Sequence, residues 1–131
     1  MENAMTELPK ILHVEDDLDI QAIALLSLET LGGFTIVQAS SGQEALEKAP
    51  AFSPDLFLLD VVMSPMDGPE LLQELRKLPQ FTQTPVIFMT AKAQPEEVQQ
   101  FVELGAIDII TKPFDPMTLA DQIRAIWQNT R

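Results

Sequence analysis

The sequence predicts an α/β fold: a doubly wound, five-stranded parallel sheet in the order 2-1-3-4-5 with a flavodoxin-like (βα)5 topology. Two observations predict it. Five short apolar runs recur along the chain, and amphipathic segments with helix start signals separate them. Strands that alternate with helices of roughly ten residues are typical of parallel sheets, and right-handed crossovers leave few topologies. With five strands, a common order is 2-1-3-4-5.

Each expected strand is four to six residues long, rich in Ile, Val, Leu or Phe, and bounded by polar or turn residues. Runs of this kind suit strands that are buried on both faces of a parallel sheet. The five runs are KILHV (10–14), FTIVQA (34–39), LFLL (56–59), PVIFMT (85–90) and IDIIT (107–111).

The first two helices are expected after the first and second strands. The pair Gly32-Gly33 marks the end of the first helix. Before the second helix, Ser41 and Glu44 fit a capping box, with Ser at the N-cap and Glu three residues later. In the first helix, four residues recur at helical spacing: Ile20, Ile23, Ser27 and Leu31.

Three further helices complete the alternation. The third is expected over residues 69–78, and Gly105 marks the end of the fourth. For the fifth, Asp115 provides an N-cap carboxylate and Pro116 stands at the first helical position. Its apolar residues at helical spacing are Leu119, Ile123 and Ile126.

The length of 131 residues fits a single domain over 1–131, with its core at about 9–128 and a flexible tail at 1–8. Apolar residues make up 46% and charged residues 21%, which is a globular profile. The absence of cysteine excludes disulfide scaffolds, thiolate zinc sites and thiol nucleophiles.

Charge and hydropathy restrict the partners. No apolar run approaches the roughly 20 residues that span a bilayer, and the N-terminal sequence lacks the features of a secretory signal. A cytoplasmic protein without membrane insertion is expected. The net charge of −12 would repel a phosphate backbone, so no direct nucleic-acid binding is expected. A cation, or a partner with a basic face, is expected instead.

Acidic and other polar residues follow the expected strands at their carboxyl ends. In the order 2-1-3-4-5, the ends of strands 1 and 3 meet at one crevice, which is where such sheets bind ligands. The ends of strands 4 and 5 lie on the other side of this crevice. The residues that should meet there are Glu15, Asp16, Asp60, Thr90 and Lys112.

This combination of residues predicts a metal site and a phosphoryl acceptor. Three converging carboxylates repel one another unless a divalent cation lies among them. Oxygen ligands without His or Cys suit Mg²⁺ better than zinc. One carboxylate could then accept a phosphoryl group, while Lys112 neutralises its charge and Thr90 donates a hydrogen bond to it.

Four motifs together resemble the receiver domain of two-component response regulators, of the chemotaxis-regulator type: ILHVEDD, FLLDVVMSPMDG, VIFMTA and TKPF. The resemblance covers about residues 9–128. It implies that Asp60 is phosphorylated. It also implies that Mg²⁺ or Mn²⁺ is held by Asp60, by Asp16 directly, by Glu15 through water, and by the main-chain carbonyl of Val62.

The resemblance assigns further roles. Thr90 matches the switch hydroxyl, and Lys112 matches the lysine beside the acceptor; both are expected to serve the phosphorylation chemistry. The bond between Lys112 and Pro113 is expected to be cis. Gly68 matches a loop glycine, and Ala91 matches the small residue that keeps the site open.

The sequence departs from the family pattern at a few positions. Ile109 stands where the family commonly has Tyr, so the switch is expected to be muted or to be read out through backbone shifts. Ser64 replaces the usual proline and Pro65 follows it, so the local turn is expected to differ. Val62 and Lys92 flank the site at positions that affect how water reaches the phosphoryl group.

Several polar and aromatic residues have simpler interpretations. Asp17 and Asp19 are expected to be a helix cap and a surface residue, because acids favour that end of a helix. His13 is expected to be a hydrogen-bonded core residue. Trp127 fits either the core edge or a partner contact.

The expected function is that of a stand-alone response regulator, and not a conventional enzyme: it would catalyse only its own phosphorylation and dephosphorylation. The expected partners are a sensor histidine kinase or phosphotransfer protein and an unknown downstream protein. Dimerisation through residues 94–128 is possible. The last expected helix ends the chain, so output comes from a separate protein unless the chain is truncated.

Three alternative functions share parts of this pattern. An unphosphorylated receiver-like interaction module is favoured by Ile109 and disfavoured by the intact acidic residues. A phosphohydrolase of the dehalogenase type needs a second Asp two residues after Asp60, where the chain has Val62. A flavodoxin-like carrier needs a phosphate loop after the first strand, where the acidic run would repel the phosphate.

Overall fold

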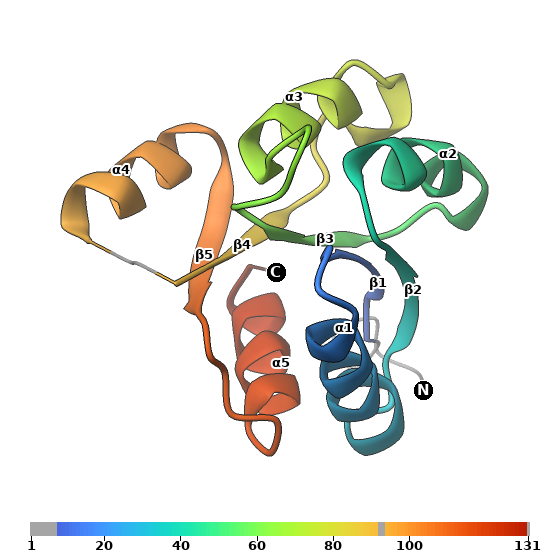
Figure 1. Cartoon of the computed structure of the whole chain (residues 1–131), viewed down its shortest axis with the longest axis vertical. Helices are drawn as coiled ribbons and strands as arrows, with labels where there is room; N and C mark the ends of the chain where they lie inside the picture. Colours follow the sequence, from blue (N-terminus) through green and yellow to red (C-terminus); the bar gives the residue numbers. More distant parts are fainter. Residues whose placement is uncertain (1–7, 92–93, 131) are drawn as a thin grey trace.

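A computed structural model describes residues 8–91 and 94–130. The expected flexible tail therefore lies, except for Leu8, outside the described residues, and so does Lys92. Five parallel strands form one sheet in the order β2-β1-β3-β4-β5. Helices α2, α3 and α4 cover one face of this sheet and α1 and α5 cover the other (Figure 1). The predicted fold class and strand order are confirmed.

The strands begin and end within one residue of the predicted positions. The third and fourth strands bury every residue, as expected for the centre of a parallel sheet. The strands are β1 Lys10–Val14, β2 Thr35–Ala39, β3 Leu56–Asp60, β4 Val86–Thr90 and β5 Ala106–Thr111.

The helices follow the strands in the predicted alternation. The first helix continues into a π-helical segment, and a short 3-10 turn follows the third. The elements are α1 Leu18–Leu25, η2 Leu26–Leu31, α2 Gly42–Phe52, α3 Gly68–Arg76, η3 Pro79–Phe81, α4 Pro95–Glu103 and α5 Leu119–Thr130. Among the described residues, no helix is long and apolar enough to cross a bilayer.

The buried face of α1 and η2 differs from the predicted helical stripe. Ile23 is 44% exposed and Leu31 is 55% exposed, whereas Ala24 and Leu28 are fully buried. Ser27 is also buried, and its hydroxyl donates a hydrogen bond of 2.6 Å to the carbonyl of Pro116. The buried face is therefore formed by Ala24, Ser27 and Leu28, and of the predicted stripe only Ser27 belongs to it.

Two predicted helix starts are also modified. Helix α5 begins at Leu119 and not at Pro116, because a turn precedes it. In this turn, the carbonyl of Asp115 accepts hydrogen bonds from the N–H groups of Thr118 and Leu119. Ser41 caps α2 by accepting from the N–H of Glu44. The Glu44 carboxylate, however, accepts from the N–H of Ser40, so the capping box is not reciprocal.

Apolar side chains pack into one cluster on each face of the sheet. The cluster beneath α2, α3 and α4 includes Phe57, Phe88 and Phe101. The cluster beneath α1 and α5 includes Trp127, which is 8% exposed. Of its two interpretations, Trp127 therefore belongs to the core. This packing leaves the carboxyl ends of the strands as the polar edge of the sheet.

Candidate functional site

The carboxyl ends of neighbouring strands bring the predicted site residues together. β1 runs directly into Glu15, β3 ends in Asp60, and β4 ends in Thr90. Lys112 follows β5, and its N–H donates to the carbonyl of Thr90 over 2.8 Å, which extends the pairing of β4 and β5. Because β1, β3, β4 and β5 are adjacent in the sheet, their ends share one edge.

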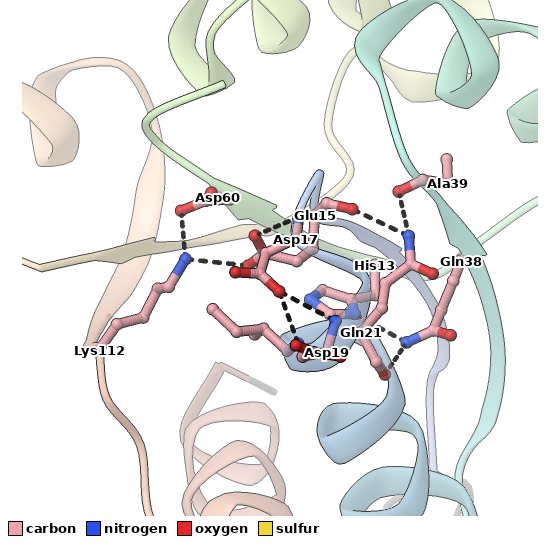
Figure 2. Close-up of polar contacts among 10 residues, drawn as sticks. His13, Glu15, Asp17, Asp19, Gln21, Gln38, Ala39, Asp60 and Lys112 are labelled. Atoms are coloured by element: carbon pink, nitrogen blue, oxygen red, sulfur yellow. Dashed lines mark hydrogen bonds and ion pairs between the residues drawn. The ribbon is translucent and has the colours of Figure 1, made fainter. Parts of the chain in front are cut away.

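Lys112 bridges two buried carboxylates at the centre of the site (Figure 2). Its Nζ lies 3.0 Å from Oε1 of Glu15 and 3.1 Å from Oδ1 of Asp60. The side chains of Glu15 and Asp60 are 1% and 5% exposed, and that of Lys112 is 16% exposed. The single ammonium group therefore offsets only part of the negative charge of two carboxylates that are almost shielded from water.

Burial and charge act in opposite directions on these groups. For Glu15 and Asp60, burial raises the pKa of each carboxyl and outweighs the hydrogen bonds from Lys112, which lower it. For Lys112, burial lowers the pKa, but the hydrogen bonds to Glu15 and Asp60 outweigh burial and raise it. The site therefore favours a cation near its two buried carboxyl groups.

A third carboxylate completes a group that could hold a metal ion. One oxygen each from Glu15, Asp16 and Asp60 lie within 4.8 Å of one another, and Asp16 is exposed. The second oxygen of Glu15 accepts a hydrogen bond of 3.2 Å from the N–H of Asp17. An all-oxygen donor set suits a hard cation such as Mg²⁺.

The first helical turn confirms the two simpler assignments beside this cluster. The carboxylate of Asp17 accepts hydrogen bonds from the N–H groups of Asp19 and Ile20, so Asp17 is the N-cap of α1. Asp19 lies exposed in the first turn.

The loop after β3 packs tightly against the backbone of Asp60. The N–H of Gly68 donates to the carbonyl of Val61 over 2.9 Å. A Cβ atom at Gly68 would lie only 2.5 Å from the carbonyl oxygen of Asp60. Glycine is therefore required here by this close approach. Val62 lies in the same loop and is 75% exposed.

Two peptide bonds near the site are cis. The bond between Lys112 and Pro113 is cis, as predicted, and the bond between Ser64 and Pro65 is cis as well. The second was not predicted, although a changed turn was expected there.

The two predicted switch positions, Thr90 and Ile109, lie near the site on β4 and β5. Thr90 is 5% exposed at the end of β4. Ile109 is half-buried and packs against the cluster that contains Phe88 and Phe101. Beside Lys112, an open apolar groove of about 350 Å³ is lined by Ile20, Ile23, Ala91, Lys112, Pro113, Phe114 and Pro116.

Sequence reasoning missed two polar residues near the site, Gln21 of α1 and Gln38 of β2. The Nε2 of Gln38 lies 3.1 Å from Nδ1 of His13, which confirms His13 as a hydrogen-bonded core residue. Burial, with the positive charge of Lys112, lowers the pKa of His13 to about 4. Two glutamines on neighbouring elements carry no spacing signal, so only the assembled fold reveals their contacts.

Comparison with known proteins gives consistent results. The sequence matches the family described as response regulator receiver domain over residues 11–124. It is 38% identical over 121 residues to the alkaline phosphatase synthesis transcriptional regulatory protein PhoP of Bacillus subtilis, covering 92% of this chain and 49% of that protein. It is 32% identical over 123 residues to the DNA-binding dual master transcriptional regulator RpaA of Synechocystis, covering 94% of this chain and 51% of that protein. The chain thus spans about half the length of these curated relatives.

Solved structures resemble the whole described fold. The chemotaxis response regulator CheY4 of Vibrio cholerae superposes with a TM-score of 0.83 at 31% identity, covering 92% of this chain and 99% of that chain. The receiver domain of the Francisella response regulator 1452 superposes with a TM-score of 0.81 at 31% identity, covering 95% and 100%.

Proposed function

Because the chain belongs to the response regulator receiver domain family of two-component signalling, we propose that it accepts a phosphoryl group on Asp60 and then changes its affinity for a downstream protein. The phosphoryl donor is a phosphohistidine of a sensor kinase or of a phosphotransfer protein. The protein catalyses only its own phosphorylation and dephosphorylation.

The bridging contact of Lys112 carries this proposal. An isolated aspartate at a strand end is most often a turn residue or a cap, but Asp60 is buried and lies 3.1 Å from a lysine ammonium. The same ammonium binds Glu15 on the neighbouring strand end. A cation held against one oxygen of Asp60 supports a role in which negative charge accumulates at that carboxylate.

The carboxylates also fit a divalent cation. We assign Glu15, Asp16 and Asp60, together with the main-chain carbonyl of Val62, to a Mg²⁺ or Mn²⁺ site. Mg²⁺, when bound, would offset the negative charge of the carboxylates and of the incoming phosphoryl oxygens.

The chain's own groups then account for the transfer. A carboxylate oxygen of Asp60 attacks the phosphorus, an O–P bond forms, and the P–N bond to the donor imidazole breaks. The electron pair of that bond stays on the imidazole nitrogen. Lys112 holds positive charge beside the acceptor throughout, and the hydroxyl of Thr90 donates a hydrogen bond to a phosphoryl oxygen.

The output surface is proposed on α4, β5 and α5, within residues 94–128. Helix α4 contains Glu96, Glu97 and Glu103 and no lysine or arginine. Like charges would oppose one another if two copies met through α4, so a partner with a basic surface fits this helix better. Dimerisation through this face, a separate output protein and a cytoplasmic location all stay predictions.

Intact-mass measurement tests the proposal. The protein is incubated with a small phosphodonor, with and without Mg²⁺, beside Asp60→Asn and the control Asp108→Asn, which changes an exposed residue of β5. We expect one phosphoryl adduct on the wild type and on Asp108→Asn, only with Mg²⁺, and none on Asp60→Asn. Labelling of Asp60→Asn would assign the acceptor to another residue.

One observation favours a second function, an unphosphorylated interaction module. Ile109 is an aliphatic residue packed on the core, and it has neither the ring nor the hydroxyl of the usual switch residue. If no kinase, phosphotransfer protein or small donor adds a phosphoryl group to the wild type, this module becomes the better interpretation.

A further inference from the structure

Two glutamine side chains hold the carboxyl end of β1 in place (Figure 2). Gln21 of α1 directs its amide Nε2 at two main-chain carbonyls, those of Glu15 at 2.9 Å and of Ala39 at 3.1 Å. These carbonyls lie where β1 and β2 end. The N–H of Glu15 donates to the same carbonyl of Ala39 over 3.0 Å. Gln21 therefore joins the ends of two strands to the first helix.

Gln38 of β2 holds Gln21 in turn. Its Nε2 donates to the main-chain carbonyl of Gln21 over 2.8 Å and lies 3.1 Å from Nδ1 of His13. A carbonyl only accepts, so the amide nitrogen must face Gln21, and His13 Nδ1 must accept the second hydrogen. His13 is therefore neutral with its proton on Nε2, which has no hydrogen-bond partner among the described residues.

The position of the Gln21 contact matters for the acidic residues. The carbonyl of Glu15 belongs to the planar peptide unit that joins Glu15 to Asp16. A hydrogen bond to this carbonyl restrains the orientation of that plane, and with it the direction in which the Asp16 side chain leaves the backbone. Asp16 is exposed, so little packing of its own side chain can do this.

We propose that Gln21 and Gln38 are positioning residues for the metal-binding carboxylates, because they fix the peptide between Glu15 and Asp16 before a cation arrives. The proposal rests on the metal site of the proposed function and deepens it. Without the two glutamines, the strand end would sample several orientations, and binding would have to select one of them, which lowers the affinity.

The test compares Gln21→Met with two controls. Methionine keeps the length of glutamine but donates no hydrogen bond. Ile11→Val shortens a buried residue of β1 itself and lowers stability without touching the strand end. Gln43→Met makes the same replacement at an exposed position of α2.

Two measurements on these variants are made without any phosphoryl transfer. Calorimetric titration gives the Kd for Mg²⁺, and amide hydrogen exchange of the metal-free protein reports the N–H of Glu15. We expect Gln21→Met to raise the Kd for Mg²⁺ about fivefold, a change that corresponds to the net free energy of about one hydrogen bond. We also expect faster hydrogen exchange at the N–H of Glu15. Both controls should bind Mg²⁺ within about twofold of the wild type, since neither removes a hydrogen bond of this network.

A kinetic comparison separates positioning from simple loss of stability. With a small phosphodonor, Gln21→Met should need more Mg²⁺ for half-maximal labelling but reach nearly the wild-type rate at saturating Mg²⁺. The Gln38 side chain contacts the main chain of Gln21 and the ring of His13 but not the carbonyl of Glu15, so Gln38→Met should give a smaller shift in the same direction. It also serves as the second variant if Gln21→Met does not fold.

The outcomes divide clearly. Wild-type Mg²⁺ affinity in both Gln21→Met and Gln38→Met would overturn the inference, and so would an equal loss in Ile11→Val. Mg²⁺ binding by the wild type without any phosphorylation would refute the proposed function and leave the positioning role intact. Failure of the wild type to bind Mg²⁺ would overturn the metal site and this inference together.

Discussion

Acidification is expected to destabilise the metal-free protein through His13, the only histidine of the sequence. Its ring is buried, its Nδ1 faces the amide nitrogen of Gln38, and its pKa falls from 6.5 to about 4, first through burial and then through the charge of Lys112. Protonation of the folded protein would place a second donor against the amide nitrogen. The folded state therefore resists a proton that the unfolded chain accepts.

The sign and size of the effect follow from this difference. Above about pH 6.5 neither state binds the proton, so His13 has no effect on the pH dependence. As the pH falls from about 6.5 to about 4, only the unfolded chain is protonated, and the free energy of unfolding decreases. The loss amounts to about 2 kcal/mol at pH 5 and about 3 kcal/mol at pH 4.

Urea denaturation of the wild type and of His13→Leu, both in EDTA, measures this loss. The raised pKa values of Glu15 and Asp60 act in the opposite direction, because these carboxyls bind protons more readily in the folded state. The wild type and the variant both contain Glu15 and Asp60, so the effect of these carboxyls largely cancels when the two free energies of unfolding are subtracted. When the pH is lowered from 7.5 to 5, we expect the free energy of unfolding of His13→Leu to rise by about 2 kcal/mol relative to that of the wild type. Parallel pH curves would refute the account of His13 as a buried neutral residue.

Three substitutions test other parts of the structure. Gly68→Ala would place a Cβ atom 2.5 Å from the Asp60 carbonyl, so we expect urea denaturation to show a loss of about 2 kcal/mol; wild-type stability would mean that the loop relaxes freely. Asp67→Ala removes a reciprocal capping box from α3 and should cost about 1 kcal/mol by the same assay, whereas an unchanged midpoint would contradict the role of the cap. Lys112→Ala should leave the protein folded but impair its phosphorylation. It should lower the free energy of unfolding by about 2 kcal/mol at pH 8 and by less at pH 5, because protonation removes the charge of Glu15 and Asp60, which the variant leaves unpaired. Equal losses of stability at both pH values, or phosphorylation at the wild-type level, would contradict the bridging role of Lys112.

Much of the fold could be predicted because strand periodicity and turn chemistry are local. The apolar run that ends at Asp60 is buried on both faces of the sheet, and a short apolar run bounded by turn residues is typical of such a strand. Once the strand order was predicted, the meeting of Glu15, Asp60 and Lys112 followed from topology alone. The site could therefore be assembled without any knowledge of side-chain contacts.

The features that escaped prediction depend on contacts between distant parts of the chain. The buried hydroxyl of Ser27 in η2 donates to the carbonyl of Pro116, which lies 89 residues away in the sequence. The link between Gln38 and His13 spans 25 residues and requires the register of β1 against β2. The capping box at Asp67 is different, because the spacing of Asp67 and Glu70 is already visible in the sequence.

The most direct test of the central claim is to identify the phosphorylated residue chemically. The protein is phosphorylated with a small donor and Mg²⁺ and then treated with borohydride, which reduces an acyl phosphate to an alcohol, so that a phosphorylated aspartate becomes homoserine. Peptide sequencing by mass spectrometry then locates the change. The account predicts homoserine at position 60 alone, dependent on Mg²⁺. Homoserine at Asp16 or Asp67, or at no position despite a phosphoryl adduct, would contradict it.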